Sequence, residues 1–314
     1  MIKQYLDPIY TKPKLRKNRW FKVFLIFGLI FGLIFYFFIF KNEEEVSKTE
    51  SLINPVLVKQ EINKPSEIPN NTINKETLDK IKLLINNKDF TTALDLINPF
   101  IDVNNDQVLE LLGIININLL KSYNTLPNKS WYIVQSGDAL WKIAKKYNTT
   151  IALIKTLNNR KTDTIRVGER LLIFNGININ KENSFKVIVS KENNTLDIFL
   201  NNQLFKRYSV GTGKFGKTPE VTFIIYDKIT EPPWTRPADN LKIEYGDPEN
   251  VLGTRWMALK ALKHPQLKGF GIHGTWDRDS IGSQSSDGCI RMFNEEVEEL
   301  FDLLPRNTVV IVTK

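Results

Sequence analysis

The sequence has almost no cysteine and almost no histidine, with one cysteine and two histidines among 314 residues. A single cysteine cannot form an intramolecular disulfide, so no internal disulfide holds this fold together. Three such residues also make a poor ligand set for a metal, and we expect neither a metal nor another cofactor. The cysteine, Cys289, is then a buried small side chain, a site for an intermolecular bond or a reactive thiol.

Positive charge is scarce outside the N-terminal segment. The net charge is +8, but residues 1–22 carry seven basic residues and one acidic residue, which leaves about +2 for the rest of the chain. A surface that binds nucleic acid is therefore not expected. The basic residues of this segment are Lys3, Lys12, Lys14, Arg16, Lys17, Arg19 and Lys22.

Residues 23–40 form one uncharged run, VFLIFGLIFGLIFYFFIF, bounded by Lys22 and Lys41. Such a run is about the minimum length for a transmembrane helix and exceeds the core of most signal peptides. No small-x-small cleavage site follows, so we expect an uncleaved single-pass membrane anchor, with a cleaved signal peptide as the alternative. The basic flank predicts residues 1–22 in the cytoplasm and everything after Lys41 on the other side of the cytoplasmic (inner) membrane, in the periplasmic or extracytoplasmic space.

The next segments are a linker and a helical region. Residues 41–74 are polar, contain three prolines and lack periodicity, which predicts a linker. Residues 75–122 show helical spacing, and we expect two or three short helices there. One predicted apolar face consists of Val108, Leu111, Leu112 and Ile115. The helical region is either a packing spacer or a partner-binding module.

Residues 131–174 predict a strand, two helices and a second strand. WYIVQ alternates as a strand, RLLIF closes the unit, and Asp138 and Thr150 are expected to cap the two helices. The stretches YIVQSGDALWKIAKKYNTTIALIKTLNN and IRVGERLLI resemble the LysM family, with Ala139 in place of the usual threonine.

LysM domains bind glycans that contain N-acetylglucosamine, so the resemblance implies peptidoglycan as a partner. An alternative is that the fold is kept and the affinity for glycan is lost. The family's groove maps onto two loops, whose predicted glycan-binding residues are Ser136, Gly137, Asp138, Leu157 and Asn158.

From Phe185 to Lys314 the pattern is mostly β. Apolar alternation in FKVIVS, TLDIFL, QLFKRYSV, VTFIIYD, RWMALK and TVVIVTK predicts strands separated by turns. One helix is expected near the end, with Asn294 as its cap and Pro305 after its last turn. Its buried face is predicted to be Val297, Leu300, Phe301 and Leu304. The fold class is therefore multidomain, with a transmembrane helix, a short helical segment, a βααβ module and a predominantly β domain at 185–314.

His273 and Cys289 are the residues of this β domain that suggest chemistry. A thiol nucleophile needs a nearby base or cation, and histidine is the usual partner. Their glycine-rich surroundings suggest positions at a rim of the domain rather than in mid-strand. Spacing alone leaves a catalytic pair and an ordinary core cysteine equally open, while His264 has no motif and is expected in a surface loop.

The stretch GIHGT followed by SIGSQSSDGCIRM resembles the signature of the YkuD-type L,D-transpeptidases, and VGTGKFGKTPEVTF resembles an upstream motif of that family. The resemblance implies that Cys289 is the nucleophile, that His273 is the general base and acid, and that the backbone carbonyl of Gly274 orients His273. It also implies substrate-site roles for Ser286, Gly288 and Arg291. Asp287 falls at a variable position and is expected to be an exposed bystander, and Glu220 and Val221 replace a usual glycine.

The activity implied by this resemblance is cross-linking of peptidoglycan. The thiolate attacks the carbonyl before the terminal D-alanine of a stem tetrapeptide, D-alanine leaves, and an amine resolves the thioester to give a 3-3 cross-link. Two alternatives stay open. The enzyme hydrolyses the thioester as an L,D-carboxypeptidase or attaches another amine, or the chain is a non-catalytic tether that binds glycan.

Overall fold

The computed structural model describes residues 73–102, 105–123, 128–176 and 184–314. The predicted cytoplasmic segment, the predicted transmembrane helix and nearly all of the predicted linker lie outside these residues. Across the described ranges, no helix combines the length and the apolar character needed to cross a bilayer.

Three α-helices and one short 3₁₀ helix occupy the region where helices were expected. They are α3 (Lys75–Asn86), α4 (Phe90–Ile97), η1 (Asn98–Phe100) and α5 (Asp106–Lys121). Each α-helix begins after a residue whose side-chain oxygen accepts a backbone N–H, and these caps are Asn74, Asp89 and Asn105. The predicted face of α5 is buried, because it packs against α3 and α4 in one apolar cluster.

The next unit has the predicted βααβ order. Its elements are β1 (Lys129–Ile133), α6 (Leu140–Lys146), α7 (Ile151–Leu157) and β2 (Arg170–Phe174), and the two strands pair antiparallel. Thr150 caps α7 as expected, since its hydroxyl oxygen accepts from the N–H of Leu153. The prediction that Asp138 caps α6 is wrong. Its carboxylate accepts instead from the N–H of Gln135 and the hydroxyl of Tyr132, both at 2.7 Å, and Ala139 holds the cap position.

The C-terminal part is built on an eight-stranded sheet in the order β13-β11-β10-β7-β14-β3-β4-β5. Its long strands are β3 (Phe185–Ser190), β4 (Thr195–Leu200), β5 (Gln203–Ser209), β7 (Thr222–Thr230), β10 (Arg255–Ala261), β11 (Gly271–Thr275), β13 (Ile290–Phe293) and β14 (Val309–Thr313). Shorter elements are β6 (Thr212–Gly213), η2 (Lys214–Gly216), β8 (Trp234–Thr235), β9 (Lys242–Ile243), η3 (Arg278–Ser280) and β12 (Gln284–Ser286). The alternating apolar runs predicted as strands are all strands.

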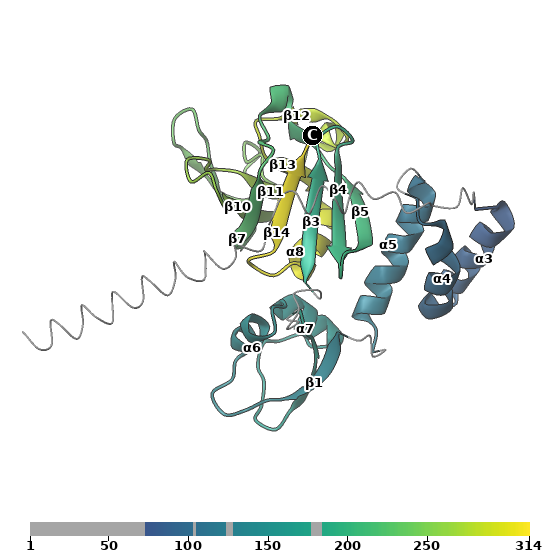
Figure 1. The fold of residues 1–314 in the computed structure, drawn as a ribbon. Coiled ribbons are helices and arrows are strands. Elements are labelled where there is room, and N and C mark those ends of the chain that lie inside the picture. The colour runs from purple at the N-terminus through teal and green to yellow at the C-terminus, as the bar shows by residue number, and fades with distance from the viewer. Residues whose placement is uncertain (1–72, 103–104, 124–127, 177–183) are drawn as a thin grey trace, which may run out of the picture. The chain divides into compact units, whose positions relative to one another are not determined.

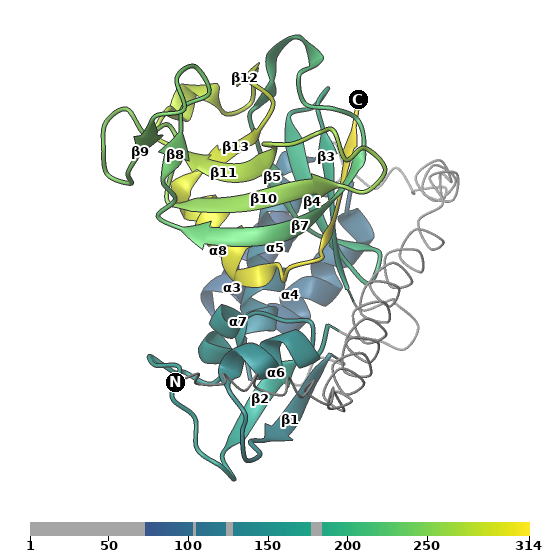
Figure 2. The same cartoon turned by 90° about the vertical axis from the view of Figure 1, so that its left-hand side faces the viewer.

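The helix α8 (Asn294–Leu303) packs against β10, β11 and β13. Figure 2 shows these strands side by side with β7, with α8 behind them. Val297 and Leu300 face the core as predicted, whereas Asn294 is not the cap. Asn294 is the first residue of the helix, and Phe293 holds the cap position. The Oδ1 of Asn294 does not cap the helix, because it accepts from the N–H of Thr254 at 3.0 Å.

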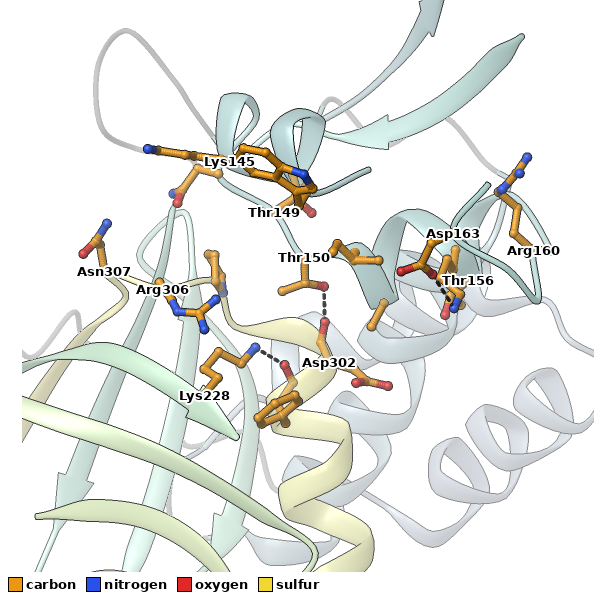
Figure 3. A pocket seen from close by; sticks show the side chains of 18 of the residues that line it. Lys145, Thr149, Thr150, Thr156, Arg160, Asp163, Lys228, Asp302, Arg306 and Asn307 are labelled. Carbon is orange, nitrogen blue, oxygen red and sulfur yellow. Dashed lines mark hydrogen bonds and ion pairs between the residues drawn. The ribbon is translucent and has the colours of Figure 1, made fainter. Parts of the chain in front are cut away.

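The helices α7 and α8 meet end to end in the hollow drawn in Figure 3. The hydroxyl of Thr150 donates to the carbonyl oxygen of Asp302, while the ammonium group of Lys228 donates to the carbonyl oxygens of Phe301 and Leu304. Leu153 and Leu157 of α7 also belong to the apolar cluster of the β domain. The last carbonyls of α8 therefore have partners, as a buried helix end requires.

Candidate active site

His273 lies on β11, and Cys289 lies directly before β13, the neighbouring parallel strand. His273 of β11 stands opposite Arg291 of β13 in the ladder, and Cys289 is the residue immediately before β13. Side chains two apart on a strand point to the same face, so Cys289 and Arg291 share the face of the sheet that carries His273. The strand register thus brings together two residues that are sixteen positions apart in the sequence.

The expectation that both residues sit at a rim is wrong for His273. All five residues of β11 are buried, and the side chain of His273 is 4% exposed. The reason is that β11 is an inner strand, with β10 and β13 on its two sides, and that the indole of Trp256 covers the ring. Cys289 is partly buried, since it belongs to the loop that leads into β13.

The ring of His273 has one defined orientation. Its Nδ1 lies 2.6 Å from the carbonyl oxygen of Gly274, and a carbonyl only accepts, so Nδ1 carries the proton and donates. The Nε2 atom is then left with a lone pair, as a general base requires. The indole of Trp256, opposite His273 on β10, stacks on the ring at a centroid distance of 5.6 Å.

The carbonyl of Gly274 is itself held in place by a neighbouring backbone. The N–H of Gly253 donates to it at 2.9 Å, so this oxygen accepts two hydrogen bonds. A Cβ atom on Gly274 would lie 2.1 Å from the Oδ1 of Asn294, and one on Gly253 would lie 1.9 Å from the same atom. Both positions therefore require glycine, because the Asn294 side chain packs against the two backbones at once.

Burial controls the protonation of His273. Desolvation lowers the pKa of its imidazole to about 4, and the nearby positive charge of Arg291 acts in the same direction. The hydrogen bond to Gly274 opposes this effect because it favours the protonated ring. His273 is therefore neutral at pH 7.

The thiol of Cys289 is also neutral at rest. Burial raises its pKa to about 11, and the charge of Arg291 partly offsets this by favouring the thiolate. The Sγ atom lies 3.5 Å from the carbonyl oxygen of Gly269, and among the described residues no hydrogen bond joins it to His273. The resting site is a thiol beside a neutral base, not a thiolate–imidazolium pair.

The loop before Cys289 is braced by a buried hydroxyl. Ser286, which is 2% exposed, donates to the carbonyl oxygen of Cys289 at 2.6 Å and accepts from the N–H of Gly288 at 3.1 Å. Gly288 has a φ of 132°, and a Cβ atom there would lie 2.9 Å from the ring of Phe270. The hydroxyl and the glycine together set the direction in which Cys289 leaves the loop.

The backbone and side chain of Arg291 both tie parts of the site together. Its N–H and carbonyl exchange hydrogen bonds of 2.8 and 2.9 Å with Gly211, which brings the segment before β6 against β13. Its guanidinium lies 3.5 Å from the carboxylate of Asp277. The positive charge thus stays next to both His273 and Cys289.

Sequence patterns gave no signal for several of these residues. Gly253, Trp256 and Asp277 lie outside the recognised motifs, and only their contacts with β11 and β13 relate them to the site. Asn294 ends the recognised signature, but it was expected only to cap the last helix. Asp287 is exposed as expected, and His264 lies in an exposed loop. Glu220 pairs with Lys191 at 2.7 Å.

The predicted glycan-binding residues fall into two groups. Ser136 and Gly137 lie in an exposed loop, with Asp138 bonded within that loop. Leu157 is buried, and the amide of Asn158 is bonded to the backbone N–H and carbonyl of Leu172 at 2.7 and 2.8 Å. The exposed loop is therefore accessible to a ligand. The side chains of Leu157 and Asn158 instead stabilise the fold, through burial and through hydrogen bonds to Leu172.

A thiol directly before one strand and a neutral, carbonyl-oriented histidine on the adjacent strand of a β domain define the class of cysteine-dependent acyl-transfer enzymes. Comparison with known proteins agrees. Residues 184–312 match the L,D-transpeptidase catalytic domain of the YkuD family. YqjB of Bacillus subtilis, assigned to the L,D-transpeptidases, is 41% identical over 128 residues, which cover 40% of this chain and 70% of that protein.

A second relative is matched almost end to end. YkuD of Bacillus licheniformis, also assigned to the L,D-transpeptidases, is 30% identical over 184 residues, which cover 58% of this chain and 98% of that protein. This chain belongs to the YkuD family of L,D-transpeptidases.

The βααβ unit is a LysM domain by the same comparison, with the match at residues 132–174. LytE of Bacillus subtilis, named as a peptidoglycan endopeptidase, is 58% identical over 40 residues, which cover 13% of this chain and 12% of that protein. The chain therefore joins a LysM domain to an L,D-transpeptidase domain.

Proposed function

We propose that this protein is a membrane-anchored L,D-transpeptidase that forms 3-3 cross-links in peptidoglycan during cell wall biogenesis. The observation that carries the proposal is the hydrogen bond from Nδ1 of His273 to the carbonyl of Gly274. It leaves Nε2 as a base on the face of the sheet that Cys289 shares. Family membership supports the same reaction.

Acylation begins when the thiol proton of Cys289 passes to Nε2 of His273. The sulfur then forms a bond to the carbonyl carbon that precedes the terminal D-alanine of a stem tetrapeptide. The C–N bond breaks, the imidazolium returns its proton to the leaving amine, and D-alanine departs. The product is a thioester on Cys289.

Deacylation repeats these steps in reverse with a second stem. Its side-chain amine gives a proton to His273 and attacks the thioester carbonyl, the C–S bond breaks, and the imidazolium returns the proton to the sulfur of Cys289. Because a thioester stays reactive toward amines, cysteine suits acyl transfer to a second peptide. Water in place of the amine would give L,D-carboxypeptidase activity, and a protein amine would give attachment to peptidoglycan.

The other predicted site residues have distinct tasks in this proposal. Arg291 holds a substrate carboxylate and favours the thiolate, since its charge lowers the pKa of Cys289. Ser286 and Gly288 contribute to the substrate site by shaping the loop that presents the thiol. The N–H of Gly288 donates to Ser286 at rest, so its use as an oxyanion donor requires that hydrogen bond to open.

The remaining parts position the enzyme. The LysM domain binds glycan strands through the exposed loop at Ser136 and Gly137, and residues 23–40 anchor the chain in the cytoplasmic membrane with the catalytic domain outside. A non-catalytic tether that binds glycan is the second candidate for the whole chain. The oriented His273 argues against it, because a tether has no need of a base with a fixed tautomer.

The experiment that tests the proposal incubates the purified full chain in detergent with tetrapeptide muropeptides and resolves the products by mass spectrometry. We expect release of D-alanine, a covalent adduct on the wild-type protein and dimers with 3-3 links. Cys289→Ala should give none of these products. Release of D-alanine without dimers would favour the carboxypeptidase, and no release from the wild type would favour the tether.

A further inference from the structure

The segment Lys214–Lys217, called the KFGK loop below, presents an unusual aromatic side chain. Phe215 is 93% exposed, and its backbone has φ 54° and ψ 33°, in the left-handed region that a bulky residue rarely adopts. Gly216 follows with a φ of 71°. A strained backbone that holds a large apolar ring in solvent persists only where the surroundings impose it, and such strain is concentrated at ligand-binding segments.

The contacts that impose this strained backbone come from the segment 284–289, which ends at Cys289. The hydroxyl of Thr218 accepts from the N–H of Gly213 at 2.7 Å and donates to the carbonyl of Gly288 at 2.9 Å. β6, just before the loop, pairs in parallel with β12, which contains Ser286. Hydrogen bonds thus join both ends of the KFGK loop to the segment that carries Cys289. Figure 2 shows β12 at this end of the sheet.

The charges on this loop are not balanced. The ammonium groups of Lys214 and Lys217 lie 3.3 and 2.7 Å from one oxygen of Asp287. One carboxylate faces two cations, so the cluster carries one surplus positive charge. All three side chains are exposed by 43% or more, so solvent screens these ion pairs and a second anion can exchange into them.

We propose that the KFGK loop recognises the anionic stem peptide of the acyl donor, with Phe215 packing on its apolar part and Lys214 and Lys217 binding one of its carboxylates. The inference rests on the proposed function and adds specificity-determining residues to it. Asp287 then has a role that its exposure alone does not indicate: it holds the two lysines in place and competes with the incoming carboxylate. Lys214, with the longer contact, is the cation more readily given up to the substrate.

The test compares two tetrapeptides that differ only in having free side carboxylates or carboxamides in their place. Acylation of Cys289 by each is followed in single turnovers by intact-protein mass spectrometry. We expect the wild type to prefer the carboxylate peptide by about fivefold, the size that exposed ion pairs allow, and the Lys214→Ala/Lys217→Ala variant to lose that preference. Asp287→Asn should increase the preference, because the competing anion is removed.

The aromatic part of the proposal has its own variants. Phe215→Ala should slow acylation by both peptides about tenfold, whereas Phe215→Trp should retain the wild-type rate because an indole offers the same apolar surface. Matched controls are Tyr123→Ala for the exposed ring and Lys80→Ala/Lys161→Ala for the loss of two exposed charges. Alkylation of Cys289 by iodoacetamide should be equal in the lysine and Phe215 variants, which separates peptide recognition from damage to the nucleophile; Asp287→Asn is left out of this comparison, because the charge of Asp287 itself raises the pKa of Cys289.

A binding measurement separates this inference from the proposed function. Calorimetric titration of both peptides into the Cys289→Ala protein requires no chemistry. If the wild type is acylated and the loop variants match it in rate and preference, the inference is overturned and the transpeptidase stands. If no acylation occurs but binding still depends on Phe215 and the lysines, recognition stands and the reaction does not. If there is neither acylation nor binding that depends on Phe215 and the lysines, both the inference and the proposed function are overturned.

Discussion

The hydroxyl of Ser286 donates a hydrogen bond of 2.6 Å to the carbonyl oxygen of Cys289, from three residues away in the same loop. The Oγ atom of Ser286 also accepts from the N–H of Gly288, so one buried hydroxyl closes the turn before the nucleophile. The shape of this turn sets the direction of the thiol.

Removal of this hydroxyl should therefore disturb the site more than the fold. Ser286→Ala removes the acceptor of the buried N–H of Gly288 and the donor to the carbonyl of Cys289, at a cost of about 1–3 kcal/mol. We expect a lower melting temperature and acylation slower by about tenfold or more. Ser285→Ala is the matched control, because its hydroxyl has only a 3.5 Å contact with the carbonyl of Ser280. Equal acylation rates in the two variants would show that Ser286 does not position Cys289.

Replacement of Arg291 should make the thiol less acidic. The guanidinium lowers the pKa of Cys289, so Arg291→Ala should move the pH profile of iodoacetamide alkylation to higher pH, by about one pH unit. Arg291→Lys keeps the charge and should move it less. A profile identical to that of the wild type in the alanine variant would contradict an electrostatic role for this arginine.

His273 should make the fold sensitive to acid. The pKa of its imidazole is about 4 in the folded state and near 6.5 when exposed, so between these pH values the unfolded chain binds a proton that the folded chain does not. Stability should therefore fall as the pH falls from 6.5 to 4, by at most roughly 3 kcal/mol from this residue. Urea denaturation at several pH values should show a shallower loss for His273→Gln. Parallel curves would indicate that His273 titrates normally.

Gly274 and Asn294 should behave as a coupled pair. Gly274→Ala places a methyl group 2.1 Å from Oδ1 of Asn294, and overpacking of this kind costs about 1–3 kcal/mol. Asn294→Ala removes the obstructing atom, so the double variant should be more stable than the sum of the single effects predicts. Chemical denaturation of all four proteins measures this coupling. Additive effects would show that the side chain of Asn294 is not the reason for a glycine at 274.

The exposed LysM loop should determine binding to glycan. Ser136→Arg adds bulk at the proposed contact and should reduce sedimentation of the protein with purified peptidoglycan, whereas Ser130→Arg, at an exposed position on β1, should not. Point variants are preferable to deletion of the domain, because Leu153 and Leu157 belong to the apolar cluster of the β domain. Unchanged sedimentation of Ser136→Arg would place the glycan elsewhere.

Local sequence patterns were reliable where one element decides the outcome. The alternation in FKVIVS and TLDIFL matches β3 and β4 residue for residue, and Thr150 caps α7 as its chemistry predicts. Asp138 and Asn294 have equally good capping chemistry but bond elsewhere. A cap forms only if no better donor competes, and for Asn294 the competing donor, Thr254, comes from 40 residues away.

The sequence by itself determined the nature of the two modules and the pair of residues at the centre of the site, because those signals are carried by short motifs and by residue chemistry. Only the tertiary structure decided that His273 is buried, that Arg291 stands opposite it, and that the KFGK loop is fastened beside Cys289. These relationships depend on which strands become neighbours. Strand order is set by the packing of the whole sheet, and no local pattern in the sequence specifies it.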